Sequence, residues 1–333
     1  MQFILPLVTI GIPTYNQQQY LAEALKSALA QTYPNLEVIV ADDCSTDSTQ
    51  NLVHGYLSDK RIKYFRNENN IGRVLNYRKL FYEYAAGNWY VNLDGDDYYI
   101  DDNFITSGIE KINSFQARGY EIMFYHSGLK TIIKDQTTTY VPNIEDEVVL
   151  ISGKTYFENF FSLNASSHLT IICNRLKALT IDYYSKNAIF TDVHSFVRLA
   201  LHGHVILDKK ISAVWRVHSE NASHLLEEQL KNEIEVKHDI SNYAIPFVGE
   251  EKAVKWFSKA KAELINNLIY KNVQSDAVYS SDWMRFFKHF RFSVFFTKHF
   301  LKYIFLSVKN YKHFFPGKYF GMLFKKIFSS LLL

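Results

Sequence analysis

The chain is poor in cysteine and has no obvious export signal. Cys44 and Cys173 are its only two cysteines in 333 residues, and they stand in separate hydrophobic contexts. Two such residues provide neither a disulfide framework nor zinc-ligand spacing, which is typical of a protein in a reducing cytosol. Residues 1–5 lack the basic region, apolar segment and cleavage site of a secretory signal, so we expect no signal peptide.

Glycine is missing from the turn that follows the first predicted strand, Leu7 to Ile12. That turn reads Pro13-Thr14-Tyr15-Asn16. It lacks the Gly-x-Gly-x-x-Gly sequence with which oxidoreductases bind a dinucleotide, and this class of enzyme is excluded. The Gly-rich, Arg-containing loop of a sugar nucleotidyltransferase is absent as well, which weighs against that class.

Acidic residues are absent from Trp283 to Leu333, a segment that carries ten Lys and Arg residues and many aromatic ones. The other 282 residues hold 27 basic and 34 acidic side chains, so the formal net charge of +3 comes from this tail. Basic side chains spaced by seven, four and seven fall on one stripe of a helix: Arg291, Lys298, Lys302 and Lys309.

Such a tail has too many lysines for a membrane span of about twenty apolar residues. It suits a helix lying in the plane of an anionic membrane surface, where each basic residue contributes on the order of 1 kcal/mol. We therefore expect residues 283–333 to hold a cytoplasmic protein peripherally on the inner face of the cell membrane. Alternatively, this tail packs into the core of the protein or forms a dimer interface. Without base-reading motifs we expect no nucleic-acid binding.

Strand-like and helix-like segments alternate through the first hundred residues. The predicted strands are Leu7 to Ile12, Leu36 to Ala41, Ile62 to Phe65 and Trp89 to Leu93, and the predicted helices are Tyr20 to Ala30, Ser45 to about Leu57, and Gly72 to Tyr84. This order predicts an α/β fold with a Rossmann-like, mainly parallel sheet flanked by helices. Ligands of such sheets bind beyond the carboxyl ends of the strands, so the residues after these strands should meet in one cleft.

The rest of the chain is less regular. We expect β-structure at Tyr120 to Tyr125, Leu129 to Ile133, Leu169 to Cys173 and Ser212 to Val217, helices at Ser152 to Phe161 and Val193 to Leu201, and a polar loop at Asn164 to His168. Two long helices, Leu225 to Tyr243 and Glu251 to Tyr270, predict a helical extension.

Three carboxylates and a glycine follow the fourth predicted strand, in Asn92-Leu93-Asp94-Gly95-Asp96-Asp97. Acids this close repel one another unless a cation or several hydrogen-bond donors lie among them. Hard oxygen ligands at a strand end suit Mg²⁺ or Mn²⁺, which leave positions for water and substrate phosphates. Taken alone, the stretch is equally compatible with a turn in which one aspartate caps the next helix.

Four motifs together resemble the family 2 glycosyltransferases. They are Pro13-Thr14-Tyr15-Asn16, Ala41-Asp42-Asp43-Cys44-Ser45-Thr46-Asp47, Asn70-Ile71-Gly72 and Leu93-Asp94-Gly95-Asp96-Asp97, and they occur in the family's order and spacing. The resemblance spans roughly Leu5 to Ser223, with Cys44 where the family more often has Gly or Ser. It implies the type A glycosyltransferase fold and a nucleotide-activated sugar as donor.

By this resemblance, the first two motifs bind the nucleotide. Pro13, Thr14, Tyr15 and Asn16 line its pocket, with the Tyr15 ring beside the base. Asp42 accepts a hydrogen bond from the base, which favours uracil because its N3–H is a donor. Tyr15 has a structural alternative as a half-buried core aromatic.

The resemblance also assigns the acid cluster, whose Asp94-Gly95-Asp96 is an Asp-x-Asp motif. Asp94 would contact the ribose or a metal-bound water, Gly95 would lie at the nucleotide sugar, and Asp96 would bind the metal that bridges the diphosphate. Asp97 would do no more than cap the next segment. Arg73 is either a further contact to base or phosphate or an exposed arginine of a first helical turn.

Arg216-Val217-His218-Ser219 resembles the family's closing motif. On that model His218 contacts the diphosphate, or it completes a metal site with Asp94 and Asp96 through a ring nitrogen, which suits Mn²⁺ better than Mg²⁺. A structural role for His218 is the alternative.

Phe190-Thr191-Asp192 precedes the helix Val193 to Leu201. The family has an acidic pair here whose second member is the catalytic base; Thr191 replaces the first acid and Asp192 matches the second. Such a base is needed because the acceptor hydroxyl must lose its proton as it attacks the anomeric carbon opposite the leaving diphosphate. Alternatively, Asp192 is a carboxylate favoured by the helix dipole.

Together these features predict a metal-dependent, inverting transferase that moves a hexose or N-acetylhexosamine from a UDP-sugar to a hydroxyl of a glycan acceptor. The tail favours a lipid-linked acceptor in bacterial surface polysaccharide (O-antigen or capsule) biosynthesis. The predicted domains are a catalytic domain over residues 1–224, a helical extension over 225–282 and a membrane-surface anchor over 283–333. The Gln-x-x-Arg-Trp motif of processive members is absent, so we expect one sugar to be added per encounter.

Two alternatives remain open. One is a catalytically inactive, membrane-associated module that binds nucleotide sugars, motivated by Thr191, and the other is a sugar nucleotidyltransferase. The sequence names neither the sugar nor the linkage, and it leaves oligomerisation open.

Overall fold

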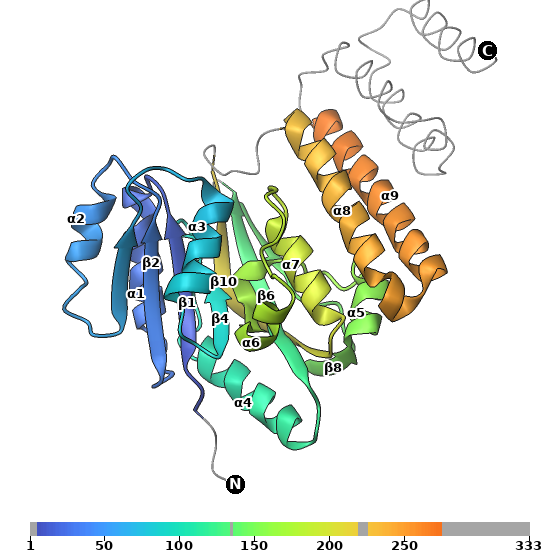
Figure 1. Ribbon diagram of the computed structural model, residues 1–333, viewed down its shortest axis with the longest axis horizontal. Coiled ribbons are helices and arrows are strands. Elements are labelled where there is room, and N and C mark those ends of the chain that lie inside the picture. The colour runs from blue at the N-terminus through green and yellow to red at the C-terminus, as the bar shows by residue number, and fades with distance from the viewer. Residues whose placement is uncertain (1–4, 134–135, 219–225, 275–333) are drawn as a thin grey trace, which may run out of the picture. The chain divides into compact units, whose positions relative to one another are not determined.

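The computed structural model describes residues 5–133, 136–218 and 226–274 (Figure 1). The chain divides into two compact units, Met1–Phe257 and Ser258–Leu333, and the fold described here is that of the first. The predicted anchor over residues 283–333 lies outside the described residues, as does Ser219 of the closing motif.

The N-terminal half of the sheet is parallel, as predicted. Its central strand β1 pairs on one side with β2, which pairs in turn with β3, and on the other side with β4. These strands are β1 (Val8–Thr14), β2 (Leu36–Asp42), β3 (Ile62–Arg66) and β4 (Trp89–Asn92). The crossovers are the helices α1 (Gln18–Leu29), α2 (Thr49–His54) and α3 (Arg73–Lys79), the last continued by the π-helical turn η1 (Leu80–Tyr84). Parallel strands carry their carboxyl ends to one edge, where the motifs follow them.

The other half of the sheet is mixed, and its full order is β3-β2-β1-β4-β9-β6-β10-β5. The additional strands are β5 (Tyr98–Tyr99), β6 (Ile122–Ile133), β7 (Gln136–Tyr140), β8 (Val148–Ser152), β9 (Ile171–Asn174) and β10 (His204–Val217). Strands β6 and β10 pair in parallel, whereas β9 runs antiparallel to both β4 and β6. The mainly parallel sheet expected for the type A glycosyltransferase fold is confirmed.

Two strands are longer than predicted. The β-stretches at Tyr120 to Tyr125 and at Leu129 to Ile133 belong to the single strand β6, and β10 begins at His204 rather than Ser212. The register between β6 and β10 shifts between Leu207 and Ala213. Such irregularities insert extra residues and interrupt the alternation of apolar side chains by which a strand is recognised in sequence.

Helices cover both faces of the sheet (Figure 1). The neighbouring residues Phe124 and Tyr125 of β6 point to opposite faces, as successive strand residues must. Tyr125 packs against Phe104 at the start of α4 (Phe104–Ala117), a helix that the sequence analysis did not predict. Phe124 packs against Tyr156 of α5 (Gly153–Asn159) and Phe196 of α7 (Thr191–Ala200). Two short helices, η2 (His168–Thr170) and α6 (Arg175–Thr180), flank β9.

The predicted helical extension is present as α8 (Leu226–Val248) and α9 (Glu250–Gln274). Within the first unit, Ser241 Oγ of α8 donates to the Ala253 carbonyl at 2.9 Å, and the Trp256 indole stacks on Phe157 of α5 at 4.9 Å. Across the part of the chain that the structure describes, no helix is both long and apolar enough to cross a membrane.

The start of α5 packs so closely on the end of α7 that it requires glycine. A Cβ added to Gly153 would stand 1.6 Å from the Ala200 carbonyl oxygen, a backbone atom that cannot turn aside. We expect Gly153→Ala to lower the free energy of unfolding in urea by about 1–3 kcal/mol or more. Gly55→Ala is the matched control, because Gly55 has helical dihedral angles and its added Cβ would lie 3.3 Å from the nearest atom. The control should change stability by less than about 1 kcal/mol, and equal losses in the two variants would contradict this account.

Candidate active site

The first motif begins with the last two residues of β1 and is tied to the second motif by hydrogen bonds. Asn16, at a positive φ of 53°, accepts a bond from the Thr46 amide through Oδ1 at 2.8 Å, and its own amide donates to Ser45 Oγ at 2.9 Å. The Thr14 hydroxyl is buried and donates to Gln17. Tyr15 is 45% exposed, so it is no core aromatic and its ring can face a ligand.

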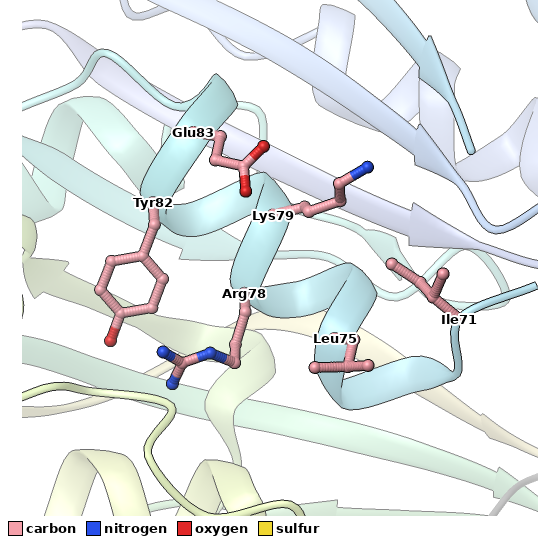
Figure 2. Close-up of a pocket in the computed structure, with 6 residues that line it drawn as sticks. All are labelled: Ile71, Leu75, Arg78, Lys79, Tyr82 and Glu83. Carbon is pink, nitrogen blue, oxygen red and sulfur yellow. The ribbon is translucent and has the colours of Figure 1, made fainter. Parts of the chain in front are cut away.

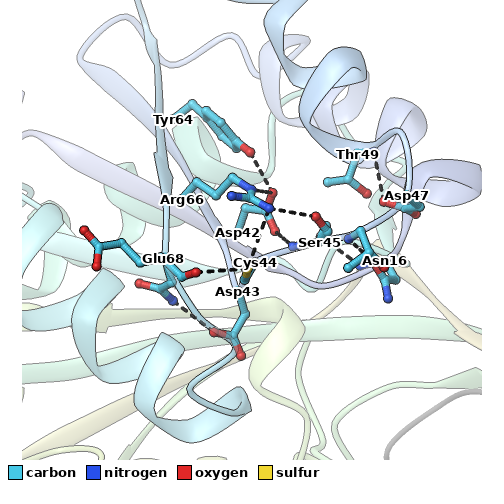
Figure 3. Close-up of polar contacts among 12 residues, drawn as sticks. Asn16, Asp42, Asp43, Cys44, Ser45, Asp47, Thr49, Tyr64, Arg66 and Glu68 are labelled. Atoms are coloured by element: carbon cyan, nitrogen blue, oxygen red, sulfur yellow. Dashed lines mark hydrogen bonds and ion pairs between the residues drawn. The ribbon is translucent and has the colours of Figure 1, made fainter.

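Asp42 ends β2 in full burial, and its contacts are drawn in Figure 3. Its Oδ1 accepts the Ser45 amide at 2.8 Å, and its Oδ2 accepts the Tyr64 hydroxyl at 2.6 Å and lies 3.7 Å from Arg66 Nε. Both oxygens therefore have protein partners, and a hydrogen bond from a base would use a remaining lone pair. The predicted role of Asp42 stays a prediction, and its observed role is to shape the turn at Ser45.

Asp43 received no role from the sequence, yet it holds the third motif in place. Its Oδ1 accepts bonds from Asn67 Nδ2 at 3.0 Å and the Ile71 amide at 2.8 Å, while Oδ2 accepts the Gly72 amide at 2.8 Å. Gly72 has a φ of +88°, which favours glycine, and α3 starts directly after it. The signal in the sequence was the second acid of the pair at the end of β2.

Asp94 lies at the centre of the acid cluster and is surrounded by donors. Its Oδ1 accepts Tyr77 Oη at 2.7 Å and Asn92 Nδ2 at 2.8 Å, and its Oδ2 lies 3.1 Å from His168 Nε2. Burial alone would raise the pKa of Asp94, but the charge of His168 and the hydrogen bonds from His168 and Tyr77 outweigh it and hold this pKa well below its usual range.

His168 joins Asp94 to the predicted base. While Nε2 faces Asp94, Nδ1 lies 3.0 Å from Asp192 Oδ2. Burial disfavours the charged ring, yet the two carboxylates raise the pKa of His168 well above its ordinary value. The sequence placed His168 in a polar loop without a function, because nothing local marks which distant groups it meets.

Asp96 and Asp97 are held by the end of β10. His218 Nε2 lies 3.0 Å from Asp96 Oδ2 and its ring stacks on Tyr20 at 4.7 Å. The Arg216 amide donates to Asp97 Oδ1 at 2.9 Å, and its guanidinium donates to the Asp96 carbonyl and to Glu23. Burial and the neighbouring negative charges raise the pKa of Asp96 and of Asp97.

The remaining predicted residues meet the same cluster. Asp192 lies in the first turn of α7, and Arg73 donates to the Ile189 carbonyl at 2.5 Å three residues before it. Thr191, which replaces an acid, is fully buried, and its hydroxyl donates to the Lys186 carbonyl at 2.6 Å.

Gly95 lies against the first motif. A Cβ on Gly95 would stand 2.4 Å from Gln17 Oε1 and 3.1 Å from Thr14 Oγ1, so the acid cluster is in contact with the first motif.

The fit of this site to a divalent metal rests on Asp96 and His218. Their facing oxygen and nitrogen are both ligand types that Mn²⁺ binds. Burial, and after it the charge of Asp94, raises the pKa of Asp96, and a bound cation would favour its charged form. Within residues 5–133, 136–218 and 226–274, no three His, Cys, Asp or Glu side chains gather as a complete ligand set. A metal here would therefore depend on substrate phosphates and water, as Mg²⁺ commonly does.

Residues 9–176 match the family model for glycosyl transferase family 2, which is half of the chain. The chain belongs to this family. Its curated relatives include TuaG of Bacillus subtilis, whose name assigns it provisionally to teichuronic acid biosynthesis, at 34% identity over 122 residues. They also include the Escherichia coli UDP-Glc:alpha-D-GlcNAc-diphosphoundecaprenol beta-1,3-glucosyltransferase WfgD, at 34% identity over 137 residues.

These matches cover part of each protein. For TuaG the aligned residues are 35% of this family 2 chain and 48% of the relative. For WfgD they are 40% of this chain and 53% of the relative, so the match spans about half of each relative.

Solved structures share the fold. Staphylococcus aureus TarS 1-349 in complex with UDP superposes with a TM-score of 0.60 at 17% identity, covering 84% of this family 2 chain and 78% of that one. The mannosyltransferase PcManGT from Pyrobaculum calidifontis, in complex with GDP-Man and Mn²⁺, gives a TM-score of 0.54 at 14% identity, over 91% of this chain and 84% of that one. At these identities the likeness concerns the fold.

A shallow depression of about 310 Å³ lies along the outer side of α3 (Figure 2). Its lining residues are Ile71, Leu75, Arg78, Lys79, Tyr82 and Glu83, and none of the clustered carboxylates is among them. Arg78 there is engaged by Asp182 at 3.0 Å. We assign no function to this depression.

The role of Asp43 can be tested through stability. Asparagine at this position has one acceptor oxygen and would turn its NH₂ toward a group that itself donates, so Asp43→Asn should lower the free energy of unfolding by about 1–3 kcal/mol. Asp59→Asn is the control, since Asp59 forms a surface pair with Arg61 at 2.8 Å, and such pairs are worth roughly 1 kcal/mol or less. Urea unfolding measures both, and a loss for Asp43→Asn no larger than for the control would refute the role.

Proposed function

We propose that this family 2 chain is an inverting glycosyltransferase that moves a hexose or N-acetylhexosamine from a UDP-sugar to a hydroxyl of a glycan acceptor. The observation that carries the proposal is that His168 contacts both Asp94 and Asp192. A single imidazole ring therefore separates the predicted base from the first acid of the Asp-x-Asp motif. Donor and base must be this close, because proton removal and displacement of the diphosphate act on the same acceptor oxygen and anomeric carbon.

The choice of donor is supported by the first two motifs and by a fold neighbour. The exposed ring of Tyr15 comes directly after β1, and the buried Asp42 ends the adjacent strand β2, where a remaining lone pair of its carboxylate would accept the uracil N3–H. TarS, with the same fold, was crystallised with UDP and with UDP-GlcNAc.

The leaving diphosphate would be met by Asp96 and His218. A divalent metal held there would supply positive charge that stabilises the departing diphosphate. His218 is kept in place by its stacking on Tyr20, and Arg216 fixes the Asp96 backbone. Pro13, Asn16, Arg73 and Gly95 complete the proposed nucleotide-sugar pocket.

The proposed acceptor is a lipid-linked glycan in bacterial surface polysaccharide biosynthesis. The name of WfgD specifies a diphosphoundecaprenol acceptor, and that of TuaG points to teichuronic acid, a surface polymer. The basic, aromatic composition of residues 283–333 agrees with work at a membrane surface on the cytoplasmic side.

Asp192→Asn tests the catalytic proposal. Loss of the base should lower the rate of sugar transfer by about 100- to 10,000-fold, while the affinity for UDP in the presence of Mn²⁺, measured by calorimetry, stays unchanged. Asp182→Asn is the control, because Asp182 carries a half-exposed carboxylate paired with Arg78. Normal transfer by Asp192→Asn would disprove the base assignment, and UDP binding by a wild-type protein that transfers no sugar from any donor of a panel would favour the inactive module.

The proposed anchor is tested by deleting residues 283–333. The shortened protein should no longer sediment with liposomes that contain anionic lipids, while the full chain should do so at low salt and less at high salt. Unchanged sedimentation after the deletion would reject the anchor.

A further inference from the structure

His168 stands between two carboxylates that come from distant parts of the sequence. Asp94 follows β4, Asp192 opens α7, and 98 positions of sequence separate them. The ring reaches both, at 3.1 Å through Nε2 and 3.0 Å through Nδ1, and its side chain is 16% exposed. A single side chain therefore fixes the relative placement of the donor-side acid and the proposed base.

His168 is itself held on a rigid support. Its short helix η2 continues into β9 in the middle of the sheet, and the next two residues, Leu169 and Thr170, are buried. The Thr170 hydroxyl donates to the Ser127 carbonyl of β6 at 2.7 Å, and the Tyr77 ring meets the imidazole edge-on at 6.4 Å. The imidazole has little freedom to turn away from either carboxylate.

Of the two carboxylate oxygens of Asp192, one is hydrogen-bonded within the protein and the other can accept a hydrogen bond from a ligand. Its Oδ2 faces His168, whereas Oδ1 has no hydrogen-bond partner among the residues that the structure describes. The side chain is 21% exposed, enough for an acceptor hydroxyl to reach it. A base must present an oxygen with a defined direction, since general-base catalysis depends on hydrogen-bond geometry.

The residue next to Asp192 cannot supply that direction. Thr191 is buried, and its hydroxyl donates to the Lys186 carbonyl at 2.6 Å. The orienting group must therefore come from another element, and His168 meets that need by contact.

We propose that His168 is a positioning residue, which holds Asp192 through Oδ2 so that Oδ1 faces the acceptor hydroxyl. The inference rests on the proposed function and adds to it a residue that does not itself touch the sugar. Its loss should affect the rate of transfer and leave donor binding largely intact.

Three substitutions separate the two hydrogen bonds. His168→Asn keeps a donor near the position of Nδ1 and so retains the contact to Asp192, whereas His168→Gln keeps one near Nε2 and retains the contact to Asp94. His168→Ala loses both. We expect kcat to fall on the order of 100-fold in His168→Gln and His168→Ala, and to stay within about tenfold of wild type in His168→Asn, because misplacing a catalytic group by about 1 Å costs this much. The KM for the donor should change far less than kcat in all three.

A double-variant cycle with Asp192→Asn provides the decisive readout. If His168 acts through Asp192, His168→Ala should cause little further loss of transfer in the Asp192→Asn background. The same fractional loss in both backgrounds would overturn the proposal, because a merely structural effect would add. His202→Ala is the control for removing a histidine hydrogen bond elsewhere, since His202 Nε2 lies 2.7 Å from the Tyr243 hydroxyl.

The outcomes distinguish this inference from the proposed function. If the wild-type protein transfers no sugar from any donor, both the proposed function and the positioning role of His168 are wrong. Wild-type transfer with wild-type rates in His168→Gln and His168→Ala would overturn the positioning role alone and leave the proposed function standing. Rates that fall in His168→Asn as far as in His168→Gln would also reject it, since the Asp192 contact would then be irrelevant.

Discussion

Three carboxylates within four residues, with Asp96 and Asp97 buried and Asp94 partly exposed, cannot share one loop unless other parts of the chain supply donors and positive charge. Asp94 meets His168, Asp96 meets His218, and Asp97 accepts the Arg216 amide. These partners arrive from η2 and from the end of β10, far along the sequence. Their convergence on the loop after β4 therefore constrains where the C-terminal half of the sheet must lie.

Strand β10 reaches this loop along an irregular course. It stays paired with β6 as far as Val217, but the register between the two strands shifts between Leu207 and Ala213, before β10 reaches Arg216. Bulges bend a strand and increase its twist. The strand end then passes the acid loop, where Arg216 also stacks over the Tyr98 ring at 4.4 Å.

The acid pair Asp42-Asp43 at the end of β2 has a different role from that of the acids after β4. Its carboxylates accept hydrogen bonds from backbone amides. Asp42 accepts the Ser45 amide, and Asp43 accepts those of Ile71 and Gly72. A carboxylate that accepts several backbone N–H groups fixes loop shape with charge-assisted bonds. The first and third motifs thus depend on Asp42-Asp43 for their form.

Elements with local signals could be predicted from the amino-acid sequence. Apolar runs and turn residues predicted β1 to β4, the helices between them and the extension α8 and α9, and the four motifs were enough to indicate the family. Helix α4 and the full length of β10 were missed, the latter because bulges hide its periodicity. Which side chains meet depended on the packed fold. His168 carries no local mark, since the contact Asp94–His168–Asp192 arises from how β4, η2 and α7 pack rather than from any spacing along the chain. Asp43 was marked only as the second acid of a pair, and its partners Ile71 and Gly72 became known from the packed fold.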